Sequence, residues 1–328
     1  MTTKAMTLKE RAIAAFTLQQ PDQIPTFELE FQLEKEVFGR NFFPDALKYD
    51  NIAKLSQRER EQAVYKLAED MAHVYTSLEY CIIPAHYCHG WFENADIGYD
   101  GRRLLLKYLK EMVGDTVLYG DHADGTFSIP DGNRMYEFAY EIADDPDAVH
   151  ARARKMMEDA IEMNKRRVDA GVDVGYMCSD YCYNSGPFLS PQMFAEFVTP
   201  YLAKIVEEAK KAGMYVIKHT DGDIMPILDQ LVECKPHALH SLDPMAGVDI
   251  KTVKDLYGDK VALCGNVNCS FLQTGTDAEL IESAEYCITH GRKNGGYIYC
   301  TSNVPFKGIN PDRYMLILDV WKRMRNYQ

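Results

Sequence analysis

Residues 214–223 read MYVIKHTDGD and indicate the fold class through a strand that passes into a short polar turn. The apolar run MYVI is typical of a buried β-strand, and the run IMPIL that follows the turn is typical of the start of a helix. Side chains of a strand alternate between its faces, so His219 and Asp221 point the same way where the strand ends. An imidazole and a carboxylate aimed at one spot suit a divalent metal or a proton-transfer pair. A helix-capping aspartate beside a core histidine is the alternative.

The same alternation of strand and helix extends along the whole chain. Besides 214–219, the sequence predicts strands at 25–30, 78–83, 116–120, 173–178, 237–242, 260–264 and 296–300. Helical patterns lie between them, at 56–76, 146–170, 190–212, 223–235, 249–257, 276–291 and 310–325. Eight strands with intervening helices predict one (β/α)8 TIM barrel over residues 1–328. A doubly wound open sheet is the alternative, disfavoured because the chain has no GxGxxG fingerprint.

An apolar stripe of Leu8, Ala12, Ala15 and Phe16 predicts that residues 1–20 form a helical arm outside the barrel.

Composition narrows the possible partners and compartment. The 328-residue chain has a net charge of −13 with its acidic residues spread out, which argues against nucleic acid and against an anionic membrane surface as partners. No apolar run approaches the length of a membrane-spanning helix. Nine cysteines, an odd number scattered through predicted strands and helices, indicate reduced thiols and a cytoplasmic location.

A barrel enzyme has its active site at the carboxyl ends of its strands. The first predicted strand ends in FELEF, residues 27–31, where glutamates alternate with apolar residues. Because helices cover the outside of a barrel, we expect the apolar residues to face outward and both Glu28 and Glu30 to face the open end. Two carboxylates on an inward face are costly unless they bind a cation or transfer protons. The alternative is that residue 30 already lies beyond the strand, in solvent.

Most other predicted strand ends also carry a residue that can bind a metal or transfer a proton. In chain order these are His86 and His89; Asp121, His122 and Asp124; Asp180 and Asn184; His219 and Asp221; His240 and Asp243; Asn266 and Asn268; and Cys300 and Asn303. Each residue alone is weak evidence of catalysis, since a loop Asp or His is usually a helix cap or a solvated residue. Together they indicate an enzyme. Tyrosines are numerous, 21 in all, and those in loops, Tyr181 and Tyr183 among them, would suit a planar ligand.

Four runs of the C-terminal half resemble the uroporphyrinogen decarboxylase superfamily. They are SGPFLSP at 185–191, HTDGDIMPIL at 219–228, ALCGNVN at 262–268 and GGYIYCTSN at 295–303. The resemblance implies a single distorted (β/α)8 barrel, in agreement with the strand count. The superfamily contains decarboxylases of polycarboxylate tetrapyrroles and corrinoid-dependent methyltransferases. The decarboxylases carry an arginine-containing motif after the first strand, where this chain has FELEF. Acidic residues there would repel a polycarboxylate, which favours the methyltransferase branch.

The methyltransferase branch holds zinc with a His-x-Cys pair and a later cysteine. His219 matches the histidine, Asp221 stands in place of the first cysteine, and Asn303 aligns with the last, with Cys300 three residues earlier. The resemblance therefore implies Zn²⁺ with a ligand set drawn from His219, Asp221, Cys300 and Glu30.

Because carboxylates replace soft sulfur, we expect an oxygen leaving group. The expected reaction is the O-demethylase type, in which a methyl group passes from a small methylated substrate, an aryl methyl ether, to Co(I) of a corrinoid-binding partner protein that supplies the cobalamin. Zinc would act as the Lewis acid. The expected catalytic residues are His219, Asp221, Glu28 and Glu30. The expected substrate-binding residues are Tyr181, Tyr183, His86, Asp180 and Asn303. The alternatives are a zinc thiol methyltransferase that uses Cys300, a decarboxylase-like enzyme, and a non-catalytic barrel that docks a corrinoid protein.

Overall fold

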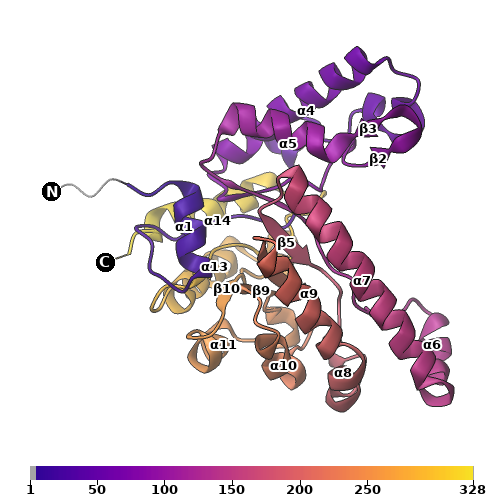
Figure 1. Cartoon of the computed structure of the whole chain (residues 1–328). Coiled ribbons are helices and arrows are strands. Elements are labelled where there is room, and N and C mark those ends of the chain that lie inside the picture. Colours follow the sequence, from indigo (N-terminus) through magenta and orange to yellow (C-terminus); the bar gives the residue numbers. More distant parts are fainter. Residues whose placement is uncertain (1–4, 328) are drawn as a thin grey trace.

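The computed structural model describes residues 5–327 and contains a parallel sheet of seven strands that curls into a barrel (Figure 1). Neighbouring strands follow one another along the chain, with helices between them, as the (β/α)8 prediction requires. The strands are β1 Ile82–Pro84, β4 Leu118–His122, β5 Val174–Met177, β8 Tyr215–Thr220, β9 Ala238–Ser241, β10 Ala262–Cys264 and β11 Tyr297–Ile298. Each overlaps one of the predicted strands, and the predicted fold class is confirmed.

The eighth position of the barrel is held by a single residue of the predicted first strand. Thr26 forms parallel bridges to both Tyr80 and Tyr299, which lie at opposite edges of the seven-stranded sheet. The Cys81 amide donates to the Thr26 carbonyl over 2.8 Å, and the Tyr299 amide donates to the Pro25 carbonyl over 2.9 Å. The sheet thus closes through residues 25–27, although the predicted strand 25–30 does not continue beyond this contact.

The expected orientation of this segment is wrong for Phe27 and Glu28. The Phe27 ring lies inside the barrel, with its centroid 6.1 Å from those of both Tyr176 and His240. Glu28 points outward, where Tyr314 of helix α14, Pro311–Met324, donates to its Oε1 over 3.4 Å. The interior of a barrel is itself a packed apolar core, so alternation fixes the period of a strand and leaves open which set of residues faces inward.

The helices cover the outside of the barrel and leave its carboxyl end to loops. They are α1 Leu8–Phe16, α2 Glu34–Phe38, α3 Tyr49–Ile52, α4 Gln57–Ser77, α5 Gly101–Val113, α6 Arg134–Asp144, α7 Pro146–Ala170, α8 Pro191–Phe197, α9 Thr199–Lys211, α10 Leu228–Glu233, α11 Ile250–Tyr257, α12 Cys269–Gln273, α13 Asp277–Gly291 and α14 Pro311–Met324. Short 3-10 turns lie at η1 Asp45–Leu47, η2 Ala95–Ile97, η3 Met225–Ile227 and η4 Pro244–Ala246. The predicted helix 190–212 is interrupted at Val198, because Pro200 lacks an amide hydrogen and its ring restricts the preceding backbone.

Two parts of the molecule extend away from the barrel. Helices α4 and α5 pack together and stand apart from it beside the hairpin of β2, Glu93–Asn94, and β3, Tyr99–Asp100 (Figure 1). Helix α7 extends past the barrel and carries α6 at its far end (Figure 1). A second hairpin, β6 Cys182–Tyr183 with β7 Gly186–Pro187, follows β5.

Helix α1 lies across the amino ends of the strands. The Phe16 ring stacks on Tyr215 at 5.2 Å and also contacts His237. The Lys9 amide donates to the Thr116 carbonyl, just before β4, over 2.8 Å. This helix falls within the predicted arm 1–20, of which residues 1–4 lie outside the described part. Within residues 5–327, every helix is too short or too polar to cross a bilayer.

Candidate active site

His219 and Asp221 meet Asp180 at the carboxyl end of the barrel. His219 is the penultimate residue of β8, Asp221 follows that strand directly, and Asp180 lies in the loop after the neighbouring β5. The His219 Nε2 atom lies 3.7 Å from Asp180 Oδ1 and 3.8 Å from Asp221 Oδ1. One ligand atom from each residue lies within 4.8 Å of the other two. We call these three residues the His219 centre.

The geometry of the His219 centre fits a cation. The separations between imidazole and carboxylates exceed hydrogen-bonding distance, yet all three groups converge. Asp221 Oδ1 is buried and accepts no hydrogen bond from the described residues, whereas its Oδ2 accepts one from Asn303 Nδ2 over 2.6 Å. A buried carboxylate oxygen without a partner costs free energy, and a metal ion would remove that cost.

His240 holds the His219 ring from behind. The Nδ1 atoms of the two histidines lie 2.8 Å apart, on paired positions of β8 and β9. Burial and the neighbouring His219 lower the pKa of His240 far below its ordinary value, so its ring is neutral. When His219 Nδ1 carries the shared proton, the lone pair of His219 Nε2 faces the two aspartates. This is the arrangement that metal-binding histidines commonly adopt toward a second group.

Burial raises the pKa of the Asp221 carboxyl, although His219 opposes the shift. The charges of Asp180 and Asp243 act in the same direction as burial. Closely spaced carboxylates of this kind become more stable when a positive ion lies among them.

A buried ion pair fixes the loop that carries Asp180. The Lys218 ammonium, 1% exposed, lies 3.0 Å from Asp124 Oδ2. It also donates to the carbonyls of Met177 and Ser179, which precede Asp180 in the chain. The Ser179 amide donates to the same Asp124 oxygen over 3.0 Å. Lys218 and Asp124 therefore position Asp180 without touching the His219 centre.

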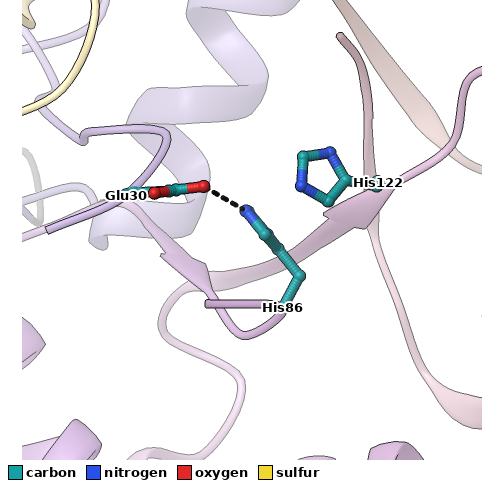
Figure 2. Close-up of side chains that lie close together, drawn as sticks. All are labelled: Glu30, His86 and His122. Atoms are coloured by element: carbon teal, nitrogen blue, oxygen red, sulfur yellow. Dashed lines mark ion pairs between the residues drawn. The ribbon is translucent and has the colours of Figure 1, made fainter. Parts of the chain in front are cut away.

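A second group of metal-ligating residues lies at the same end of the barrel. Figure 2 shows Glu30, His86 and His122 pointing toward one another from the ends of three neighbouring chain segments. Glu30 Oε1 lies 3.8 Å from His86 Nε2, and the His86 and His122 ring centroids are 4.1 Å apart. We call these three residues the His86 cluster.

Ring contacts through Tyr176 and Phe27 connect the His86 cluster to His240. Tyr176 contacts His86 at 5.4 Å and Phe27 at 6.1 Å, and Phe27 contacts His240 at 6.1 Å. The two groups share no residue and lie at the same end of the barrel.

A family profile for uroporphyrinogen decarboxylase (URO-D) matches residues 130–315, more than half of the chain. The chain belongs to the uroporphyrinogen decarboxylase family. Among curated proteins, nothing matches its sequence.

One solved structure shares this fold over almost its whole length. A methyltransferase from Methanosarcina mazei superimposes with a TM-score of 0.69 at 16% identity, covering 97% of this chain and 99% of that one. Two other matches are weaker. A xylose isomerase-like TIM barrel/4-hydroxyphenylpyruvate dioxygenase fusion protein has a TM-score of 0.37 and 13% identity, covering 67% of this chain and 35% of that one. A xylose isomerase-like TIM barrel protein from Mycobacterium smegmatis in complex with magnesium has a TM-score of 0.34 and 10% identity, covering 80% of this chain and 90% of that one. Only the first score is high enough to support a shared fold.

Three residues that the sequence placed in the site lie elsewhere in this uroporphyrinogen decarboxylase-family barrel. Glu28 is 2% exposed and accepts hydrogen bonds from the amide and hydroxyl of Thr301. Cys300 is fully buried near Glu28, whose charge contributes to its raised pKa, and it is outside both groups. Tyr181 is fully buried against Phe194, with its ring 4.0 Å from the Lys218 ammonium. None of these three side chains is among the residues that converge in either group.

The other predicted residues lie near the barrel end in different arrangements. Asn303 holds Asp221, Asp180 belongs to the His219 centre, and Glu30 and His86 belong to the His86 cluster. Tyr183 is 46% exposed in the β6–β7 hairpin. The contact between His240 and His219 was not predicted from the sequence. Both histidines lie near the ends of consecutive predicted strands, and that position could have indicated the contact.

Proposed function

We propose that this protein is a methyltransferase that moves a methyl group from an aryl methyl ether to Co(I) of a corrinoid protein. The observation that carries the proposal is the oxygen-rich His219 centre, in which one imidazole faces two carboxylates at the carboxyl end of the barrel. Such a set favours a harder Lewis acid than a thiolate set does. The Methanosarcina mazei protein that shares the fold is a methyltransferase, which supports the same class of reaction.

His219, Asp221 and Asp180 would hold a zinc ion. Bound there, zinc would supply Lewis acidity toward the ether oxygen and stabilise the departing phenolate. The unpartnered Oδ1 of Asp221 fits this role, as does the Nε2 of His219, which faces both carboxylates. Cys300 is not part of the proposed ligand set, because it is fully buried in the core and belongs to neither group.

The protein's own residues would keep the ligands in position. His240 orients the His219 ring, Asn303 Nδ2 holds one oxygen of Asp221, and Lys218 secures the loop of Asp180. Asp180 has the most exposed side chain of the three ligands, 45%, so substrate would approach from its side. Preorganised groups of this kind lower the cost of reaching the transition state.

The cobalamin would arrive on a partner protein, and the reaction would take place in the reducing cytoplasm. All nine cysteines are free thiols, which agrees with that compartment. The family name favours decarboxylation as a second candidate. Against it, Glu30, Asp180 and Asp221 would repel a substrate that carries many carboxylates.

The test is a screen of methoxyaromatics, methanol, methylamines and thiols with a Co(I) or methyl-Co(III) corrinoid protein, monitored by visible absorbance. We expect methoxyaromatics to methylate Co(I) with the wild-type protein and His219→Ala to abolish the reaction while the circular dichroism spectrum is retained. His290→Ala, on α13, is the matched control and should keep full activity. Methylation of thiols, decarboxylation of a tetrapyrrole, or no reaction with any methyl donor would each contradict the proposal.

A further inference from the structure

The His86 cluster contains a buried imidazole that the described protein leaves without partners. The His86 side chain is 4% exposed. Neither of its ring nitrogens has a hydrogen-bond partner among residues 5–327, since Glu30 Oε1 lies 3.8 Å from Nε2. An imidazole buried in this way loses its hydrogen bonds to water and gains none in return. A ligand from outside the chain that binds one of these nitrogens would offset part of this loss.

The three side chains of the cluster offer two imidazole nitrogens and one carboxylate oxygen. Their ligand atoms lie within 4.8 Å of one another, and Figure 2 shows that they converge. Two histidines and one carboxylate form a common site for divalent transition metals such as Zn²⁺, Fe²⁺ and Co²⁺. His122 is the exposed member, so the site is open to solvent on its side. That opening leaves room for a water molecule or a substrate oxygen as a further ligand.

Outer contacts hold the carboxylate of the cluster in a productive orientation. Gln32 Nε2 donates to Glu30 Oε2 over 3.0 Å, which leaves Oε1 directed at His86. A hydrogen-bonded second oxygen is a regular feature of carboxylate ligands to metals.

The position of His122 is fixed by the preceding residue. Asp121 is buried and accepts hydrogen bonds from Arg102 Nε over 3.0 Å and from Arg167 Nε over 2.9 Å. Its other oxygen accepts from Trp91 Nε1 and from the His122 amide. These contacts tie the end of β4 to α5 and α7, so His122 stands on rigid backbone.

We propose that Glu30, His86 and His122 form a second divalent-metal site, separate from the His219 centre and able to bind Zn²⁺ or Co²⁺. This site goes beyond the proposed methyl transfer, because its ligands, its neighbours and its occupancy do not depend on His219. Each group has its own three ligating residues and shares none with the other, so each should fill independently.

The test measures metal stoichiometry and does not depend on activity. The purified protein is stripped with a chelator and dialysed against Co²⁺, then against Zn²⁺, with binding followed by elemental analysis and by the visible absorption of Co²⁺. We expect wild type to bind two ions per chain. His122→Ala and Glu30→Gln should each weaken one of the two by roughly 100-fold or more, since each removes a ligand. His219→Ala should remove the other ion.

The controls separate a missing ligand from a damaged fold. His89→Ala changes a neighbouring histidine that packs on Phe43, outside the cluster, and should retain two ions. Glu30→Gln keeps the shape of the side chain, so a loss of metal in this variant reports the missing ligand even if an alanine variant unfolds. If His122→Ala and Glu30→Gln both retain wild-type stoichiometry and affinity, the second site is refuted. A different result is that His219→Ala binds metal as wild type does, while His122→Ala and Glu30→Gln each lose an ion. In that case the second site stands and the metal assignment of the proposed function is wrong.

Discussion

At the scale of single residues, buried charges behind the His219 centre control both stability and geometry. Lys218 and Asp124 lie on the far side of β8 from His219, and their ion pair is almost completely buried. Burial, the largest single influence, would raise the pKa of Asp124, but Lys218 together with hydrogen bonds from Ser179 and Thr126 lowers that pKa to about 2. Such a pair is costly to break, because removing one member leaves the other charged and without a partner.

Asp124→Asn should therefore destabilise the protein by about 3–5 kcal/mol at pH 7. The measurement is the free energy of unfolding in denaturant. The double variant Asp124→Asn with Lys218→Met should lose less than the sum of the two single losses, because it removes both charges. A loss below about 1 kcal/mol for Asp124→Asn would show that Lys218 has found another partner.

Glu28 makes the stability of the protein depend on pH. Burial raises its pKa to about 8, despite hydrogen bonds from Thr301. In the unfolded chain this carboxyl ionises near pH 4.3. Between these two values the folded state binds one more proton than the unfolded state, so stability falls as pH rises and the loss is complete above about pH 8.

Glu28→Gln removes this titration while keeping an amide in place of the carboxyl. From pH 5 to 9 the variant should lose less stability than wild type does, by about 2–5 kcal/mol at 1.36 kcal/mol for each pKa unit. Unfolding free energies at several pH values provide the measurement. Glu59→Gln is the control, because hydrogen bonds from Ser56 lower the pKa of that carboxyl and its titration lies below this range. Parallel slopes for Glu28→Gln and wild type would mean that Glu28 is ionised in the folded protein.

At the scale of elements, the turn after β8 determines where Asp221 lies. Gly222 has a φ of +82°, and a Cβ atom there would lie 2.4 Å from the Cys182 carbonyl oxygen. The turn thus packs directly on the β6–β7 hairpin, and its backbone amide also contacts Asp243. Asp221 is held in its place by this close backbone approach.

Gly222→Ala should displace the turn and cost roughly 2–4 kcal/mol, combining left-handed strain with a steric clash. We also expect weaker zinc binding at the His219 centre, measured by competition with a chromophoric chelator. Gly213→Ala is the matched control, since Gly213 also has a positive φ of +94° but open space around its Cβ position. It should cost about 1–2 kcal/mol and leave zinc affinity intact. Equal zinc affinity in both variants would show that the turn does not position the ligands of the His219 centre.

At the scale of the whole molecule, closure of the barrel brings distant parts of the chain to one end. Glu30 and His122 lie far apart in the sequence yet belong to one cluster, and Asn303 reaches Asp221 across 82 residues. Ions bound by such groups join segments that separate on unfolding, so metal binding should stabilise the entire fold.

Zinc should therefore raise the midpoint of thermal unfolding over that in a chelator. With free zinc at 100 times the dissociation constant, each filled site adds about 2.7 kcal/mol. Scanning calorimetry with zinc and with chelator measures the difference. His219→Ala should lose part of the shift, and adding His122→Ala should remove the rest. An unchanged midpoint in wild type would argue against both metal sites.

Local sequence patterns were enough to predict the period and order of the secondary structure. Eight apolar segments between helical patterns were enough to predict the barrel, and seven of them form the strands of the sheet. The convergence of His219 and Asp221 also followed from local alternation, because both lie at the end of one strand.

Which side of a strand faces inward, and which strand ends meet, depends on how the whole barrel packs. Phe27 took the inward position that the sequence assigned to Glu28, because the interior of a barrel is as apolar as its outer face. Cys300 went to the core and Glu30 joined His86 and His122, because such contacts depend on how the sheet closes and not on spacing within one segment. Alternation is a property of neighbouring residues, whereas a binding site at the end of a barrel is a property of all eight strand positions together.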